Sequence, residues 1–325
     1  MNSKEKYVQI CESDKGKQIP IFSKYWWMDT VCGSDNWDVW IYEKSGTVFA
    51  VMPYYWEQRG KYKYITRPVL TQNNGIIFFY PSNQKYTRRL SFEEEIINSA
   101  VEFIDNLDVD VYEQQYRYTF DNFVPFYWNN FSALTRYTFV IEDTTDIEKI
   151  FNNFDSKMKN CVRKGRKETS VFIDDISIDD FYSEHKKIYL KQSMECPISY
   201  DLWFRLYRVC KEYNCCKILC ARDNNDNVHS ILFMIWDSES VYLLLGGSMP
   251  QFSWSNSYSM LIFESIKMAS KMGLAYDFEG SVISKINRSY REFGGIQKSY
   301  FRVRKVYNPE IVIQEANEYI EKISR

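Results

Sequence analysis

The sequence predicts an α/β protein with two similar domains in tandem, each built on a mixed, mostly antiparallel sheet that is flanked by helices. The chain has 325 residues, of which 45% are hydrophobic, and this content is enough to fill two cores. One order of elements, namely helix, hairpin, strand, helix and strand, occurs in both halves. Such a unit is longer than the roughly 20–50 residues of a solenoid repeat, so we predict two domains, 1–142 and 143–325.

The first half opens with a tryptophan-bearing helical segment at Phe22–Cys32. A hairpin follows, with strands at Trp37–Tyr42 and Val48–Trp56 on either side of a Ser-Gly turn. A third strand is expected at Gly75–Tyr80 and a fourth at Val109–Tyr112. All four are rich in β-branched or aromatic residues, which favour strands.

The second half repeats these elements. Tyr200–Tyr213 is the corresponding helix, and Lys217–Ala221 and Val228–Trp236 form the hairpin. Val241–Gly246 is the third strand and Ala275–Phe278 the last. The two halves therefore suggest an internal duplication of one α/β unit.

A helix is expected before the last strand of each half. In the first half, Ser91 and Glu94 are spaced as a capping box that would open this helix. In the second half, Ser255 or Asn256 caps the helix. Gly273 would end it, because glycine readily adopts the left-handed conformation that closes helices.

The stretch from Ala275 to Lys305 is the most informative part of the chain. It is predicted to form a strand, a polar loop that begins at Glu279, a short helix that stops at Gly294–Gly295, and a second strand. Trp128–Ile141 aligns with Tyr290–Val303 without gaps and repeats the pattern at lower fidelity. This order places polar groups at the end of a strand.

The composition argues against several classes of function. Eight cysteines without paired spacing indicate reduced thiols, and a polar start without a long apolar run predicts a cytoplasmic protein with no signal peptide or membrane span. His185 and His229 are the only histidines, so a metal site is not expected, and a serine-histidine triad would have to use one of them. The sequence has neither a phosphate-binding P-loop nor a dinucleotide fingerprint.

Charge and aromatic content leave alternatives open. The net charge of −2 says little about partners, but a basic helix from Lys157 to Lys167, which includes Arg163, is either a solvated face or a site for an anionic ligand. Lys285–Lys305 is also basic. Aromatic residues form 18% of the chain and could stack on sugars or bases, although their strand and helix patterns are typical of cores.

Four stretches together resemble the FemAB-like branch of the GNAT acyltransferase superfamily, in which two GNAT-type domains are fused. They are FSKYWWMDTVCGSDNWDVWIYEKSGTVFAVMPYYW near the start, VPFYWNNFSALTRYTFVIE in the middle, KMKNCVRKGRKE at the domain junction and DFEGSVISKINRSYREFGGIQKSYFRV near the end. The resemblance implies two GNAT-like domains and transfer of an acyl group from a thioester to an amine, without a covalent enzyme intermediate. It also implies a role in surface-polysaccharide or cell-envelope synthesis.

The resemblance places catalysis in the second domain. Glu279 would accept the proton of the attacking ammonium, with Asp277 as a second candidate on the same side of the strand. At least one of the two is expected to cap the next helix instead. Tyr290 stands four residues before Gly294, where many GNAT enzymes have the tyrosine that protonates the leaving thiolate, and it also fits a core position.

The donor's phosphates would lie at the start of a helix, where free backbone N–H groups and the helix dipole favour anions. The candidate residues in this turn are Gly246, Gly247, Ser248, Ser255, Asn256 and Ser257. The expected donor is an acyl-CoA or another phosphopantetheine thioester. Because GGSMPQFSWSNSYSM has no glycine after Gly247, unlike the usual GNAT loop, an acyl carrier protein or an aminoacyl-tRNA is an alternative donor.

The acceptor is expected to be a small-molecule amine, such as an amino sugar or a sugar nucleotide. Arg291, Lys298, Arg67 and Arg163 are candidates to bind its anionic part. The first domain has VYEQQ in place of DFEGS and would shape the acceptor side. Two other functions stay open: an aminoacyl-tRNA-dependent FemAB-type peptidyltransferase, whose FK..FGG pattern is replaced here by SYREFGG, and a degenerate pair of domains that only binds.

Overall fold

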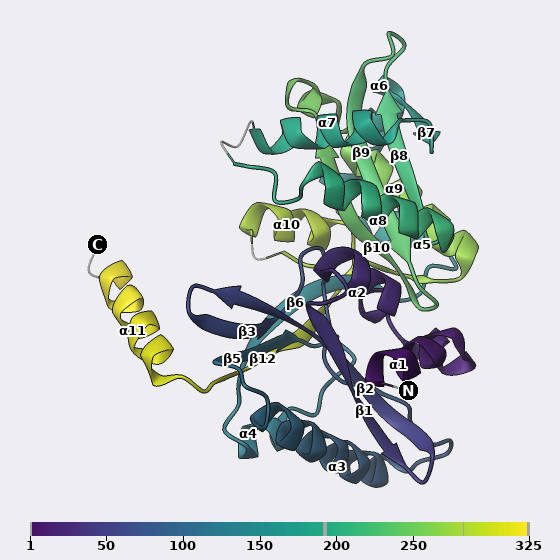
Figure 1. Ribbon diagram of the computed structural model, residues 1–325. Helices are drawn as coiled ribbons and strands as arrows, with labels where there is room; N and C mark the ends of the chain where they lie inside the picture. The colour runs from purple at the N-terminus through teal and green to yellow at the C-terminus, as the bar shows by residue number, and fades with distance from the viewer. Residues whose placement is uncertain (1, 191–193, 282, 324–325) are drawn as a thin grey trace. The chain divides into compact units, whose positions relative to one another are not determined.

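The computed structural model describes residues 2–190, 194–281 and 283–323, and the chain divides into two compact units (Figure 1). The first unit comprises Met1–Arg136 and Ser299–Arg325, and the second comprises Tyr137–Lys298. This division differs from the linear boundary after residue 142, because the last strand of the chain pairs with a strand of the first unit. The carboxyl-terminal segment therefore folds with the amino-terminal half.

The first unit holds most of its elements before residue 136. In chain order these are α1 (Ser3–Glu12), η1 (Asp14–Gln18), η2 (Ile21–Ser23), α2 (Tyr25–Cys32), β1 (Trp37–Lys44), β2 (Thr47–Arg59), β3 (Tyr62–Thr66), β4 (Ile77–Phe78), α3 (Tyr86–Asp105), β5 (Val111–Gln115), α4 (Val124–Trp128) and the start of β6 (Ser132–Ile141). Most of β12 (Ile296–Val306) and all of α11 (Pro309–Ile323) complete it.

The second unit begins within β6 and ends within β12. Between them lie α5 (Ile147–Asn153), α6 (Ser156–Glu168), β7 (Ser170–Ile173), α7 (Ile178–Leu190), α8 (Tyr200–Glu212), β8 (Cys216–Arg222), β9 (Val228–Trp236), β10 (Ser240–Ser248), η3 (Pro250–Ser255), α9 (Ser257–Met272), β11 (Ala275–Asp277) and α10 (Ser284–Glu292).

The duplication is confirmed by the strand pairing. In the first unit the strands follow the order β1-β2-β3-β5-β12, and β3 and β5, which α3 connects, are parallel. In the second unit the order is β6-β11-β10-β9-β8-β7, and β10 and β11, which α9 connects, are parallel. The other neighbouring strands within each unit pair in the antiparallel orientation. Both units thus have the mixed, mostly antiparallel sheet that was predicted.

Each unit has its own hydrophobic core. In the first, Ile97 and Ile104 of α3 pack with Tyr112 of β5 and Val303 of β12. In the second, one core lies between the sheet and helices α6 and α9. The two helices approach closely at Gly165, where an added Cβ would lie 2.8 Å from the Cβ of Met260.

The other face of the second sheet is covered by α7 and α8. Trp203 of α8 stacks on Phe181 of α7, with ring centroids 4.5 Å apart, and meets Phe233 of β9 edge to face. Both faces of this sheet are therefore closed by helices. This explains why β9 is buried along nearly its whole length, with no alternation of polar residues.

Three predictions for the first half were wrong in detail. The expected strand at Gly75–Tyr80 is reduced to β4, which pairs with β2, and β3 takes the place of third strand. The strand predicted at Val109–Tyr112 is β5, which begins at Val111, two residues later than expected. Helix α3 begins at Tyr86, and Ser91 lies inside it, so the capping box does not exist. The helix therefore begins earlier than expected, and an ion pair between Arg89 and the buried carboxylate of Glu93 stabilises this added part.

The described part of the chain lacks a membrane-spanning helix and a cluster of metal-binding side chains. No helix in the described ranges has the length and apolar character needed to cross a membrane. Among the same residues, no three His, Cys, Asp or Glu side chains are grouped closely enough to hold a metal ion. The eight cysteines are free, and five of them, Cys32, Cys210, Cys215, Cys216 and Cys220, are buried.

Candidate functional site

The candidate site lies in the second unit, where β10 and β11 stop pairing. The two strands pair through three residues, from Ser240 opposite Ala275 to Tyr242 opposite Asp277. β10 then continues to Ser248, paired with β9 on its other edge. In the described part of the chain, no strand pairs with the β11-facing edge of β10 beyond Tyr242. An open strand edge of this kind can hydrogen-bond an extended ligand.

Asp277 holds the turn that follows β11. Its side chain is buried, and Oδ1 accepts hydrogen bonds from Oγ1 of Thr138, at 2.6 Å, and from the backbone N–H of Glu279, at 2.8 Å. Asp277 therefore has a structural role in this turn, which differs from the helix cap that was expected of one of the two acids. It does not cap α10, whose first residue follows Ile283 and receives no side-chain cap.

Glu279 is held in an unusual backbone conformation. Its φ is +63°, in the left-handed region that is unfavourable for residues with a Cβ. The next residue, Gly280, has φ +61° and lies against β6, where an added Cβ would be 2.3 Å from the carbonyl oxygen of Tyr137. Packing against β6 and the hydrogen bond to Asp277 thus fix the backbone that carries the Glu279 side chain, and strain at such a position is a frequent feature of functional sites.

Two buried tyrosines from other elements lie near this turn: the ring of Tyr290 is 5.1 Å from that of Phe278, and Tyr258 interacts with Tyr290. Burial raises the pKa of Tyr290, on α10, and the charges of Glu279 and Asp277 raise it further. Burial also raises the pKa of Tyr258, on α9, with contributions from Tyr290 and Tyr276. These phenols are consequently protonated at neutral pH and can act as hydrogen-bond or proton donors beside a carboxylate.

Tyr258 was not predicted from the sequence. It follows directly after the predicted donor-binding residues, and the signal that could have revealed it is Gly246. This glycine has φ +152°, and an added Cβ would lie 2.5 Å from the carbonyl oxygen of Ile231 and 3.1 Å from the ring of Tyr258. The missing side chain at Gly246 therefore makes room for the tyrosine.

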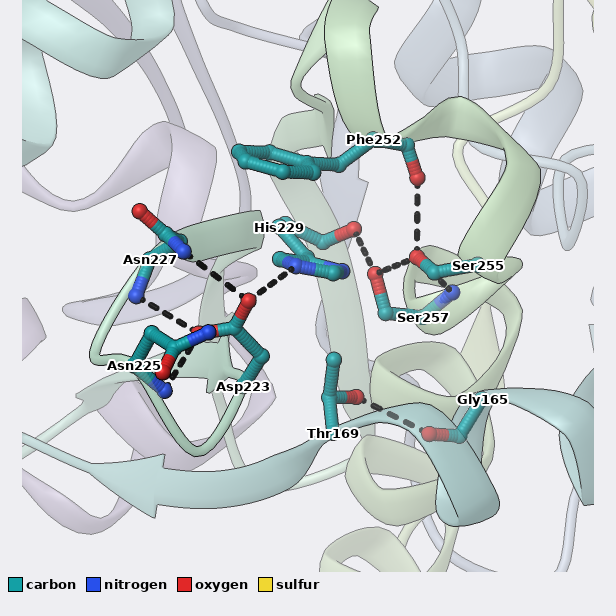
Figure 2. A network of polar contacts seen from close by, with 10 residues as sticks. Gly165, Thr169, Asp223, Asn225, Asn227, His229, Phe252, Ser255 and Ser257 are labelled. Carbon is teal, nitrogen blue, oxygen red and sulfur yellow. Dashed lines mark hydrogen bonds and ion pairs between the residues drawn. The ribbon is translucent and has the colours of Figure 1, made fainter.

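The serines at the start of α9 are occupied by internal contacts (Figure 2). Ser255 and Ser257 are fully buried, and their hydroxyls are 3.0 Å apart. Ser257 also lies 2.6 Å from the hydroxyl of Ser230, and its backbone N–H donates to Oγ of Ser255. Asn256 has left-handed φ of +56° and makes no side-chain cap. These hydroxyls thus bond to one another and shape the loop, and donor binding at the start of α9 stays a prediction.

His229 lies beside this serine network and does not form a triad (Figure 2). Its Nε2 is 3.3 Å from Oδ2 of Asp223, and its ring stacks on Phe252 at 4.0 Å. Hydrogen bonds from Asn227 lower the pKa of Asp223 to about 2, so this carboxylate is ionised. Within the described ranges no hydrogen bond reaches Nδ1 of His229, so no serine hydroxyl completes a triad.

The basic candidates are spread over the chain. Arg291 on α10 is exposed, and Lys298 forms an ion pair of 2.8 Å with Glu142. Arg163 on α6 is exposed and donates to Asn160 at 3.2 Å. Arg67 lies in the first unit and is exposed. Arg291 directly follows Tyr290 in the sequence, so it is the basic candidate nearest to this tyrosine along the chain.

No protein-family model matches the sequence, and no curated protein is detectably similar to it. Solved structures are similar in fold. The crystal structure of FemX has a TM-score of 0.68 with 12% identity, and the match covers 93% of this chain and 96% of FemX. A conserved protein of unknown function from Bacteroides thetaiotaomicron has a TM-score of 0.58 with 11% identity. This match covers 93% of this chain and 97% of the Bacteroides protein.

A third similar structure is the C-terminal domain of a protein assigned as a lysylphosphatidylglycerol synthetase from Agrobacterium fabrum. Its TM-score is 0.55 with 9% identity, and the match covers 94% of this chain and 93% of that domain. These similarities show that the chain has a FemX-like fold. The predicted architecture of two GNAT-like α/β domains is therefore confirmed, while identities this low say nothing about the reaction.

Proposed function

We propose that this protein transfers an acyl or aminoacyl group from an activated donor to an amine, in a site formed by the second unit. The observation that carries the proposal is the placement of two buried tyrosines between the Glu279 turn and the open edge of β10. The ring of Tyr290 lies 5.1 Å from that of Phe278, and the ring of Tyr258 lies against Gly246 of β10. The FemX-like fold supports it, because the same fold is shared with a protein whose name denotes attachment of lysine to a lipid.

In the proposed reaction, the amine loses a proton to Glu279 and attacks the carbonyl carbon of the donor. The bond between this carbon and the leaving group breaks, and Tyr290 supplies a proton to the departing atom. The raised pKa keeps Tyr290 protonated at neutral pH. It also makes the phenol a weaker acid, so proton transfer to the alkoxide of an aminoacyl ester is more favourable than transfer to the less basic thiolate of a thioester. Asp277 acts through the backbone N–H of Glu279 and positions this residue.

The donor is proposed to be a thioester of CoA or of phosphopantetheine. Its pantetheine amides would pair with the edge of β10 near Gly246 and Gly247, since this edge continues beyond the last residue paired with β11. Gly247 lies under α7, where an added Cβ would be 3.0 Å from Ile188. The acceptor is proposed to be an amino sugar or a sugar nucleotide used in cell-envelope polysaccharides, with Arg291 near its anionic part.

An aminoacyl-tRNA is the second candidate donor. The resemblance of the sequence to FemAB-type proteins favours it, and the fold similarity to FemX over 93% of this chain agrees with that resemblance. The buried serines at the start of α9 also favour a donor without a pyrophosphate at this position, since Ser255 and Ser257 bond to each other. The two donors share the proton transfers proposed for Glu279 and Tyr290.

A product assay distinguishes these candidates. The purified protein would be incubated with acyl-CoAs or with charged tRNA and a panel of amino sugars, lysine and phosphatidylglycerol, and products would be detected by mass spectrometry. Glu279→Gln should lower turnover by roughly 10²-fold or more. Glu212→Gln, a change of the same type on the exposed end of α8, should not alter it. Equal turnover in both variants would contradict the role of Glu279.

Hydrogen exchange tests the donor site without a known acceptor. If CoA binds along β10, it should protect backbone amides between Gly246 and Ser257. Protection confined to the first unit would show that the proposed donor site is wrong.

A further inference from the structure

A cavity of about 460 Å³ lies entirely within the first unit and plays no part in the proposed reaction. Its volume is in the range of small-molecule sites. Three guanidinium groups line it, from Arg59, Arg302 and Arg304, together with two carboxylates, from Glu113 and Glu315. Cavities lined by several arginines are typical of sites for anionic groups, because the planar guanidinium binds phosphate and carboxylate oxygens in pairs.

The sheet brings these groups together because side chains alternate between its faces. Tyr112 of β5 and Val303 of β12 point into the core beneath α3. Their neighbours Glu113, Arg302 and Arg304 therefore lie on the opposite face, and Arg304 is paired with Glu113 in the register of the two strands. The sequence pattern RVR on a strand thus places two cations on one face.

An aromatic ring also lines the cavity. Tyr64 of β3 lines the cavity, and the guanidinium of Arg59 lies 4.5 Å from the centre of its ring. Arg59 is about half exposed and forms an ion pair with Glu57, which does not line the cavity. This arrangement leaves a stacked cation and ring at the side of the cavity, beside the two arginines of β12.

Glu315 reaches the cavity from α11 and binds Arg304 through both of its oxygens. Nη1 of Arg304 donates to Oε2 at 3.0 Å, and Nη2 donates to Oε1. The carboxylate of Glu113 contacts Arg302, and it lies 3.4 Å from Nε of Arg304. Arg304 therefore already holds an anion in the geometry of a bound ligand, and that anion belongs to the protein's own last helix.

Helix α11 is only weakly attached. Ile311 is its single buried residue among 309–323, and Glu310 forms exposed contacts with Lys61 and Tyr62. Its remaining large apolar side chains are half to two-thirds exposed: Val312, Ile313, Tyr319, Ile320 and Ile323. The paired hydrogen bonds between Arg304 and Glu315 join the helix to β12 beyond its first turn.

We infer that this cavity binds a phosphorylated small molecule, and that a phosphoryl group of the ligand displaces Glu315 from Arg304. A tethered carboxylate acts at an effective concentration on the order of millimolar, so a single carboxylate in solution would compete poorly with it. A phosphoryl group carries more charge and an additional oxygen, and it can engage Arg302 as well as Arg304. Ligand binding and release of α11 are consequently linked.

Inorganic pyrophosphate is a suitable probe, and its binding can be measured by calorimetry at constant ionic strength. Glu315→Gln removes the competing carboxylate and should tighten pyrophosphate binding by about three- to tenfold. Glu318→Gln is the matched control, because it removes the same charge from the same helix at a residue that does not line the cavity. Arg304→Gln should abolish saturable binding. In the wild type, pyrophosphate should increase hydrogen exchange in α11.

Several outcomes would overturn the inference. If Glu315→Gln and Glu318→Gln tighten binding equally, the effect is general charge and not displacement. Wild-type affinity in Arg304→Gln would place the anion elsewhere, and no saturable binding to either the wild type or Glu315→Gln would show that the cavity takes no phosphorylated ligand. Because the cavity lies in the first unit, none of these results depends on whether the second unit catalyses transfer.

Discussion

The turn that positions Glu279 can be tested through the glycine that follows it. Gly280 has φ +61°, and an added Cβ would lie 2.3 Å from the carbonyl oxygen of Tyr137. Gly273, which ends α9, has φ +69° and nothing within 4 Å of the added Cβ. Alanine at either position adopts the left-handed conformation at a free-energy cost of about 1 kcal/mol. Only alanine at 280 also forces the turn away from β6.

The expected difference follows from these distances. Displacing a packed backbone costs about 1–3 kcal/mol, so Gly280→Ala should lower the free energy of unfolding by about 2–4 kcal/mol and Gly273→Ala by about 1 kcal/mol. Urea denaturation with matched slopes measures both. Gly280→Ala should also impair transfer, because Glu279 moves with the turn. Equal losses of stability in the two variants would refute the close packing of the turn on β6.

Three further predictions concern single side chains. Glu279→Gly relieves the strain of φ +63° and should raise the free energy of unfolding by about 1 kcal/mol while abolishing transfer; a larger loss of stability than in Glu279→Ala would contradict this. Tyr290→Phe should lower turnover by roughly 10²-fold with little change in melting temperature, and unchanged turnover would show that the phenol donates no proton. Burial lowers the pKa of His185 to about 4, so the folded state should lose up to about 3 kcal/mol as the pH falls from about 6.5 to about 4. In that window the unfolded state binds a proton that the folded state does not. His185→Phe, which keeps an aromatic ring beside Phe181, should remove this part of the acid dependence in urea titrations at several pH values; an unchanged dependence would assign it to other groups.

Local patterns in the sequence were sufficient for most elements of the second half. The hairpin of β8 and β9, the third strand β10 and the end of α9 at Gly273 agree with the predictions, because strand propensity and glycine caps act over a few residues. The first half was harder. A two-residue strand at Ile77–Phe78 depends on its pairing with β2, which is distant in the sequence. The early start of α3 is supported by a contact within the helix, between Arg89 and Glu93.

The candidate site was only partly predictable for the same reason. The sequence placed Asp277 and Glu279 on one side of a strand, but the strand ends at Asp277 and Glu279 turns into a left-handed conformation. The structural role of Asp277 therefore depends on Thr138, which is distant in sequence and donates a hydrogen bond to its carboxylate. Tyr258 escaped prediction because a tyrosine in the first turn of a helix has no distinctive local pattern.

By itself, the sequence determined the duplicated α/β units, since these follow from periodic apolar residues, turns and caps that act over a few residues. The resemblance of four stretches to FemAB-like proteins implied the fold that the similarity to FemX shows. Only the tertiary structure decided that residues 299–325 return to the first unit, where β12 pairs with β5 and Glu315 meets Arg304. It also decided that Ser255 and Ser257 are buried. Long-range packing decides which strand or side chain a segment contacts. A segment that could pair with several strands has no local sequence feature that identifies its partner.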